Sequence, residues 1–228
     1  MRPLVTVVVP VLADTAAAAA LASQMPDDPR LELVVVDGGH DESLERSLGA
    51  RPRARLIRTA PGRARQMNAG AAIAGGEWLL FLHADSSLPR DWLTAFSRMA
   101  PEAVGGWFRF ALDDPAWQAR ALERLVAWRV RWLRLPYGDQ GLFVRRDVFQ
   151  ALGGYRDQPL LEDVDFVRRL RRAGAVAELP MPLATSARRW RRDGWLRRSS
   201  KNAAIAVLYF AGVSPARLAR WYTGGQTP

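Results

Sequence analysis

The chain has 228 residues, enough for one compact domain with a substantial core. It contains no cysteine, which excludes disulfide bonds and thiolate chemistry. The net charge of +10 is uneven, because residues 1–114 carry 12 basic and 14 acidic side chains while residues 115–228 carry 21 and 9. The second half is therefore expected to face nucleic acid, a phosphate-bearing substrate or an acidic membrane surface.

No stretch of the sequence is long enough to cross a bilayer. The longest apolar run, Ala203–Val213, is about half of the roughly 20 residues that a spanning helix needs. The first residues, Met1–Thr6, lack the charged-then-apolar pattern of a signal peptide. We therefore expect a cytoplasmic protein, with membrane association left open by its basic second half.

In the first half, apolar runs rich in β-branched residues alternate with helical segments. Helices are predicted from Asp14 or Thr15 onward and over Arg63–Ala74, after a turn at Pro61-Gly62. Such alternation predicts a mainly parallel sheet, in which ligands bind beyond the carboxyl ends of the strands. Four strands are predicted, over Leu4–Val9, Leu31–Val36, Ala54–Thr59 and Glu77–Leu82.

The second half mixes further strands with helices rich in Arg and Trp, and we start from a single domain over residues 1–228. Strands are predicted over Gly106–Leu112, Gly141–Val144, Val176–Leu179 and Leu183–Ser186. Helices are predicted over Asp91–Met99, Trp117–Leu135, Asp147–Leu152 and Glu162–Ala173, with a last helical region from Lys201 to Tyr222.

Two predicted strands end at an aspartate. Asp37 follows four apolar residues and precedes Gly38 and Gly39, so its carboxylate is expected to project at the sheet edge beside a close-approaching ligand. A turn after a buried strand also requires Asp and Gly, which is the structural alternative. His83 and Asp85 are two residues apart, so their side chains point the same way.

One carboxylate and one imidazole at a strand end can hold a divalent cation when phosphate oxygens and water complete its shell. The alternative is that His83 is a satisfied histidine at a strand end and that Asp85 caps the turn at Ser86–Pro89. Glu162 and Asp163 open a helix, where acidic residues are common without catalysis. However, Asp163 follows a loop, Gln158–Leu161, that could lie over the sheet edge, and a base there could deprotonate an acceptor hydroxyl.

Two further segments carry candidate binding residues. The string Arg188–Arg192 combines guanidinium groups, which pair bidentately with phosphate, with the indole of Trp190, or it is a solvated basic face. Asp139 and Gln140 are candidates for acceptor hydroxyls, or belong to an ordinary turn.

In order along the chain, these pieces resemble the family 2 glycosyltransferases from about Thr6 to Trp190. The similar motifs are a base- and ribose-binding turn (Leu33–Asp41), an Asn-x-Gly segment (Arg63–Gly70), a DxD-like motif (Leu82–Asp85), a Gly-Gly-aromatic motif (Gly153–Tyr155), a Glu-Asp motif (Leu161–Asp165) and a Gln-x-x-Arg-Trp-like element (Ser186–Trp190). More narrowly, the chain resembles a bacterial subgroup labelled arsenosugar-biosynthesis glycosyltransferases in Gly138–Gly141, the Ser186–Trp190 string and Gly212–Pro215.

The resemblance implies a GT-A fold, a Rossmann-like, mostly parallel α/β sheet flanked by helices, with a C-terminal helical extension. It implies inverting transfer from a nucleotide sugar, bound by residues 1–114, to an acceptor hydroxyl bound by residues 115–228. Asp163 would be the catalytic base, and Asp85 with His83 would hold Mg²⁺ or Mn²⁺. The implied donor-binding residues are Pro10, Asp37, Gly38, Gly39, Arg63, Arg65, Asn68, Asp85, Arg189 and Trp190.

Some departures and alternatives remain. His83 stands where the family has the first Asp of DxD, and Ser186 where processive members have Gln, so polymer synthesis is not expected. The sequence does not identify the acceptor, for which anionic and lipid-linked molecules are candidates. It also leaves a homodimer possible. Two other functions remain as alternatives: a nucleotidyltransferase, or a basic protein that binds nucleic acid or a membrane without being an enzyme. A binding protein would leave Asp37, Asp85 and Asp163 without a role, so no specific nucleic acid is expected.

The Trp117–Leu135 segment interleaves tryptophans with arginines. This pattern suits the headgroup layer of a membrane, where indoles sit at the interface and cations meet anionic lipid. Alternatively, the helix packs on the sheet or on another subunit, with Arg stems covering apolar surface.

Overall fold

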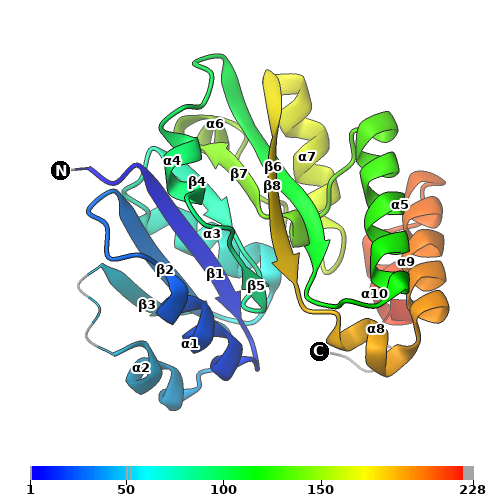
Figure 1. The fold of residues 1–228 in the computed structure, drawn as a ribbon, viewed down its shortest axis with the longest axis horizontal. Coiled ribbons are helices and arrows are strands. Elements are labelled where there is room, and N and C mark those ends of the chain that lie inside the picture. Colours follow the sequence, from blue (N-terminus) through cyan, green and yellow to red (C-terminus); the bar gives the residue numbers. More distant parts are fainter. Residues whose placement is uncertain (1, 50, 52, 223–228) are drawn as a thin grey trace.

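The computed structural model describes residues 2–49, 51 and 53–222, which form a curled sheet flanked by helices (Figure 1). Within these residues the eight-stranded sheet has the order β3-β2-β1-β4-β7-β6-β8-β5. The pairs β1/β2, β1/β4, β2/β3 and β6/β8 are parallel, and the pairs that β7 makes with β4 and β6, and β5 with β8, are antiparallel. The predicted mostly parallel α/β sheet is confirmed.

The strands are β1 (Val5–Val11), β2 (Leu31–Asp37), β3 (Ala54–Arg58), β4 (Trp78–Phe81), β5 (Ser86–Ser87), β6 (Ala103–Leu112), β7 (Leu142–Arg145) and β8 (Ala175–Thr185). The helices are α1 (Thr15–Gln24), α2 (Glu42–Leu48), α3 (Arg63–Ile73), α4 (Trp92–Phe96), α5 (Trp117–Leu133), α6 (Arg146–Ala151), α7 (Glu162–Ala173), α8 (Arg188–Asp193), α9 (Trp195–Phe210) and α10 (Pro215–Tyr222), with a 3-10 turn at Gly138–Gln140. No helix in this part of the chain has both the length and the apolar character to span a bilayer.

Two predicted elements differ from the structure. The strands expected on either side of Pro180 and Pro182 are one strand, β8, whose pairing with β6 shifts register near Arg109. β8 tolerates the prolines because β5 pairs only with its last residues, so the other side is an open edge there. The single C-terminal helical region is two helices, α9 and α10, separated at Gly212, where φ is +91°.

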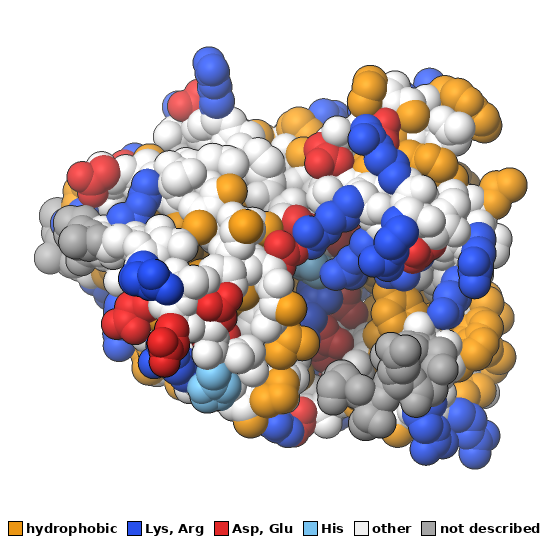
Figure 2. Space-filling model, turned by 90° about the horizontal axis from the view of Figure 1, so that it is seen from below, with side chains coloured by type: hydrophobic (Ala, Val, Ile, Leu, Met, Phe, Trp, Pro, Cys, Tyr) orange, Lys and Arg blue, Asp and Glu red, His pale blue; other side chains and the backbone are white. Residues whose placement is uncertain are grey.

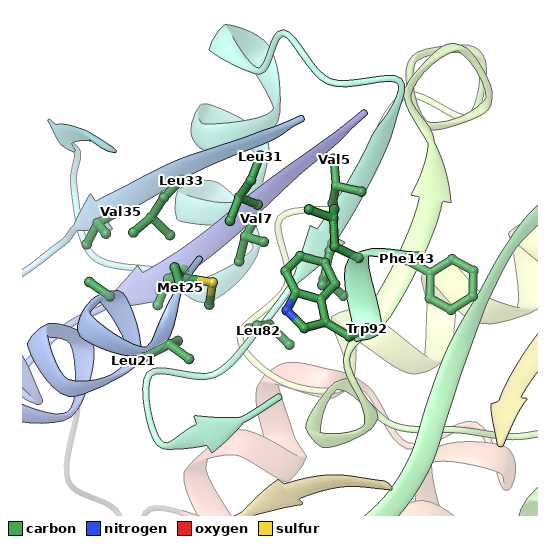
Figure 3. Close-up of a cluster of buried hydrophobic side chains, with 14 of the residues drawn as sticks. Val5, Val7, Leu21, Met25, Leu31, Leu33, Val35, Leu82, Trp92 and Phe143 are labelled. Carbon is green, nitrogen blue, oxygen red and sulfur yellow. The ribbon is translucent and has the colours of Figure 1, made fainter. Parts of the chain in front are cut away.

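The core lies on both faces of the parallel strands. Val5, Val7 and Val9 pack on one face with α1 and α4, whereas Val8 packs on the other face with α3. Figure 3 shows the first cluster, where side chains of β1, β2 and α1 meet Trp92. Burial on both faces explains why these strands are continuous apolar runs rather than alternating ones.

Helix α3 lies close on the sheet and is tied to the second half of the chain. A Cβ on Gly70 would touch the side chains of Val8 and Val36, so only glycine permits this approach. Asn68 donates its Nδ2 to the carbonyl oxygen of Tyr155 (2.7 Å) and accepts from the Tyr155 amide (2.9 Å). The Asn-x-Gly and Gly-Gly-aromatic motifs therefore meet in space as one packing unit.

Substituting Asn68→Ala should remove both hydrogen bonds and leave two backbone groups of Tyr155 without partners. We expect a loss of about 1–3 kcal/mol in the free energy of unfolding, measured with urea. Gln150→Ala, an exposed change on α6, is the control and should stay within about 0.5 kcal/mol. If Asn68→Ala lowers the free energy of unfolding no more than Gln150→Ala does, Asn68 does not have this stabilising role.

Candidate active site

A cleft of about 850 Å³ lies beyond the carboxyl ends of β1 and β4. This volume is in the usual range for small-molecule sites. Figure 2, which looks onto this end of the molecule, shows acidic and basic side chains gathered in a hollow. The walls come from five segments: Pro10–Asp14, Pro61–Gln66, His83–Asp85, Asp157–Pro159 and Arg188–Arg189.

The turn after β2 shapes this cleft from behind. The Asp37 carboxylate is fully buried and accepts hydrogen bonds from the amides of Gly39 (2.8 Å), His40 (2.9 Å) and Asp41 (2.8 Å). The expected projecting carboxylate is therefore not observed, because the turn's own amides surround both oxygens. The structure instead follows the alternative in which a buried strand ends in an Asp-stabilised turn.

Gly38, Gly39 and Gln66 hold the β1 end that lines the cleft. The Gly38 amide donates to the carbonyl oxygen of Val11 (2.8 Å), and a Cβ on Gly39 would collide with the carbonyl of Leu12. Gln66 is buried, and its Nε2 donates to the carbonyls of Val11 (2.7 Å) and Val36 (2.8 Å). Sequence reasoning missed Gln66, although a polar side chain on the sheet-facing side of a helix indicates a buried hydrogen-bonding role.

A smaller chamber of about 160 Å³ adjoins the cleft on the side of the second half. The two cavities share four lining residues, Arg63, His83, Asp85 and Arg189. The chamber is lined by the 3-10 turn, by the start of α7 and by side chains of α9. The loop before α7 contributes Gln158 and Pro159 to the cleft and Leu161 to the chamber, so it lies over the sheet edge as predicted.

Arg63, the first residue of α3, occupies the junction between the cavities. Its guanidinium is paired with Glu162 (3.3 Å) and is hydrogen-bonded to Nε2 of His83. Burial opposes its charge, but Glu162, Asp163 and Asp139 outweigh burial and raise the pKa of Arg63. Arg63 therefore remains a cation that balances several carboxylates.

The contact with Arg63 bears on the expected metal ligands. Burial, followed by the charges of Arg63 and Arg189, holds the pKa of His83 well below its usual value. The imidazole is thus neutral at neutral pH, but its Nε2 is engaged by Arg63. In this conformation His83 is not available to a cation beside Asp85.

Asp85 is in a different position, because its carboxylate lines both cavities. Its Oδ2 lies 3.2 Å from Nη2 of Arg188, which also pairs with Asp14. The described residues contain no cluster of three or more acidic or histidine side chains able to hold a metal ion. The chain therefore fits a cation only in the manner usual for Mg²⁺, with one carboxylate plus phosphate oxygens and water.

Asp163, on the first turn of α7, is oriented by backbone amides. It is 8% exposed, and its Oδ2 accepts from the Gly138 amide (2.5 Å) while its Oδ1 accepts from the Val164 amide (2.8 Å). A Cβ on Gly138 would collide with the Arg63 guanidinium, so glycine is what lets this amide reach Asp163. The carboxylate is consequently fixed in the chamber wall beside Arg63.

Asp139 lies in the same chamber, but its Oδ1 is buried and has no hydrogen-bond partner among the described residues. Burial raises the pKa of Asp139 to about 6, with a further increase from Asp163, while Arg129 and Arg63 oppose the shift. Gln140 points elsewhere, because its Nε2 donates to the carbonyl of Phe108 (3.3 Å) and it is almost fully buried.

The basic segment before α9 spans both cavities. Arg189 is exposed, lines both of them and forms no ion pair with any residue that the structure describes. Trp190 lines only the chamber, where its indole stacks on Trp195 at 6.4 Å between ring centroids. On the opposite wall of the cleft, Arg65 pairs with Asp157 (2.8 Å) and so holds the loop that leads to α7.

Of the predicted donor-binding residues, the structure brings five to the cleft: Pro10, Arg63, Arg65, Asp85 and Arg189. Trp190 lies in the chamber. Asp37, Gly38, Gly39 and Asn68 line neither cavity, because their polar groups hold the surrounding backbone. Sequence reasoning also missed Glu162 as the partner of Arg63 and Arg188 as the bridge between Asp14 and Asp85.

A family model for glycosyl transferase family 2 matches residues 10–155, which is more than half of the chain. The chain belongs to glycosyl transferase family 2. The protein is therefore a glycosyltransferase that uses a nucleotide-sugar donor, and the curled sheet with its flanking helices is a GT-A fold. A comparison with curated proteins finds no match.

The matched range separates the site residues that the family match supports from those that only the structure places. It includes the β1 end, Arg63 and Asp85, but it ends before Asp163 and the Arg188–Trp190 segment. The chamber residues of this glycosyltransferase that follow residue 155, Asp163 among them, are therefore placed by the structure alone. The nucleotidyltransferase considered from the sequence is not favoured by the family match.

The raised pKa of Asp139 predicts a pH-dependent effect on stability. A carboxyl group with a pKa near 4 unfolded and about 6 folded favours the fold when protonated, and this contribution is lost as the pH rises from about 4 to above 6. Asp139→Asn should therefore raise the free energy of unfolding at pH 7 by up to about 3 kcal/mol, with little effect near pH 4.

Urea unfolding at both pH values would measure this difference. Asp27→Asn, an exposed carboxylate far along the chain, is the matched control and should show no such pH dependence. Equal stability of Asp139→Asn and the parent at pH 7 would show that the Asp139 carboxylate is not held in an unfavourable site.

Proposed function

We propose that this glycosyltransferase transfers a sugar with inversion, with the donor in the large cleft, the acceptor in the chamber and Asp163 as catalytic base. One observation carries the proposal: the cleft and the chamber meet at a shared wall formed by Arg63, His83, Asp85 and Arg189. A single displacement requires the acceptor and the leaving group on opposite sides of the reacting carbon. Two cavities that meet at one junction provide this arrangement.

On the donor side, the chain offers a carboxylate and cations for a diphosphate. Arg189 lines the cleft and has no acidic partner among the described residues, so its guanidinium is free to pair with phosphate oxygens. Asp85 is the proposed ligand for Mg²⁺ or Mn²⁺, which when bound would neutralise charge on the leaving diphosphate. His83 can join Asp85 only after Arg63 releases its Nε2.

On the acceptor side, Asp163 is proposed to take the proton of the attacking hydroxyl. Its two hydrogen bonds from backbone amides hold the carboxylate in one orientation, which is what a positioned base requires. Asp139, with an unpartnered buried oxygen in the same chamber, is proposed to accept a hydrogen bond from an acceptor hydroxyl. Gln140 is given only a supporting role, because its side chain donates to the Phe108 carbonyl and accepts from the Tyr137 amide.

The finer identity is also part of this proposal. The division into a donor-binding half to about residue 114 and an acceptor-binding half beyond it agrees with the walls of the chamber, most of which come from residues after 136. Membership of the arsenosugar-biosynthesis subgroup is proposed on the resemblance of the Gly138–Gly141 string, which supplies the Gly138 amide to Asp163 and Asp139 to the chamber.

Asp85→Asn should weaken Mn²⁺-dependent binding of a nucleoside diphosphate by at least about tenfold, because removing a ligand costs metal affinity. Calorimetry with and without Mn²⁺ measures this. Asp157→Asn removes an equal charge from the same cleft and should leave the metal dependence intact. If the two variants behave alike, Asp85 is not the metal ligand.

Asp163→Asn should keep donor affinity within about twofold but lower sugar transfer by about 10²-fold or more, since removing a base affects the chemical step rather than ground-state binding. Asp165→Asn, two residues further along α7, is the control, because this carboxylate pairs with Arg156 and Arg169 outside the chamber. Transfer by Asp163→Asn at a rate close to that of the control would reject Asp163 as the base.

A further inference from the structure

Helix α5 has two apolar faces, and only one of them is used by the fold. Ala119, Val126 and Val130 are buried against β6 and β7. The opposite face remains exposed in the part of the chain that the structure describes. Its members recur at helical spacing and form one stripe: Trp117 (74% exposed), Leu125 (58%), Trp128 (56%) and Trp132 (67%).

Cations flank this stripe on one side. Arg120, Arg124 and Arg131 are exposed and fall on the same side of the helix at i, i+4 and i+11. The only acidic residue of α5, Glu123, is used internally, because it pairs with Arg120 (2.8 Å) and accepts from the Leu112 amide (2.8 Å). Arg124 and Arg131 form no ion pair with any described residue, so their charge is available to a partner.

Helix α9 carries a second exposed apolar row. Its members are Leu196 (85% exposed), Val207 (67%) and Phe210 (51%), on a helix that contains no acidic residue. Both helices stand at the same end of the molecule, beyond β6 and β8 (Figure 1). Orange side chains accordingly gather toward that end in Figure 2, among blue ones.

We propose that the outward face of α5 binds an anionic lipid surface. Indoles have an apolar ring and a polar N–H, which suits the boundary between headgroups and acyl chains. Arginines beside them meet anionic headgroups, and their apolar stems remain with the stripe. Neither requirement depends on the sugar-transfer reaction, so the proposal stands apart from the assignment of the catalytic residues.

A second copy of the chain fits this face less well. In a two-fold dimer the same patch appears on both sides of the interface. Packing α5 on α5 would place Arg124 and Arg131 near the same residues of the other copy, with no free acidic residue on the helix to offset them. Like charges facing each other suppress association, whereas anionic lipid is complementary.

The test is co-sedimentation of the full chain with vesicles of phosphatidylcholine alone and of phosphatidylcholine with phosphatidylglycerol. We expect binding only to the anionic vesicles, and a decrease as salt is raised. Trp128→Gln with Trp132→Gln should weaken this binding by at least about tenfold. The corresponding double Phe variant retains aromatic surface and should keep most of the binding.

A charge-matched pair separates a local patch from net charge. Arg124→Gln with Arg131→Gln should weaken binding by about fivefold per charge removed. Arg90→Gln with Arg98→Gln removes the same charge from exposed positions outside α5 and should have little effect. All variants change exposed side chains, and thermal unfolding followed by circular dichroism checks that they remain folded.

Three results would overturn the proposal. One is the absence of vesicle binding at low salt by the folded parent chain. Another is an equal loss for the Arg90/Arg98 pair, which would mean that only net charge matters. The third is a dimer in sedimentation velocity that the Trp128/Trp132 Gln variant dissociates while vesicles are not bound, since the stripe would then be a contact between copies.

Discussion

The guanidinium of Arg63 connects the parts of the chain that build the site. Arg63 begins α3 in the first half, contacts His83 beyond β4, and pairs with Glu162 at the start of α7. Burying a charge is unfavourable unless it is compensated, and here one cation compensates carboxylates contributed by distant segments. Removing that cation would leave Glu162 and Asp163 buried side by side, so the junction of the cavities depends on this interaction.

The carboxylates of the site differ in how the protein holds them. Asp37 accepts hydrogen bonds from three backbone amides and Asp163 from two, so each carboxylate is held in a fixed orientation. Asp139 has a buried oxygen without a partner. A carboxylate kept in such an environment reduces stability, and unfavourable polar groups of this kind concentrate where a ligand will complete the bonding.

Much of the fold could be predicted from the sequence because strands buried on both faces leave long apolar runs. The run before Asp37 was located in this way, whereas the helix Glu162–Ala173 was placed by the acidic residues that open it and by Gly174 after it. What could not be predicted is the direction of individual polar groups. Whether the Asp37 carboxylate faces a ligand or its own turn depends on the backbone of His40, whose φ is +59°, a conformation that the sequence does not specify.

Contacts between distant segments were also beyond the sequence. Arg188 meets Asp14 and Asp85 from just beyond the end of β8, which reaches this edge because its last residues pair with β5, directly after Asp85. The motif order singled out Asp85, which lines both cavities, but it gave no sign that Arg188 and Asp14, from opposite ends of the chain, lie beside it. Likewise, helical spacing identified Trp and Arg on α5, but only the position of the sheet distinguishes the buried face from the exposed one.

The excess positive charge of the second half is distributed in a way that bears on the acceptor. Part of it is used internally, since Arg169 pairs with Asp165, and Arg191 with Asp114. The chamber itself is not basic, because its acidic side chains outnumber its arginines: Asp85, Asp139, Glu162 and Asp163 against Arg63, Arg189 and Arg198. A free anion in the chamber would therefore meet as much repulsion as attraction, whereas a neutral hydroxyl-bearing molecule would meet hydrogen-bond acceptors. Arg124 and Arg131 on α5 lie outside the chamber and form no ion pair with a described residue, so part of the charge asymmetry of the sequence belongs to that outer surface and not to the acceptor site.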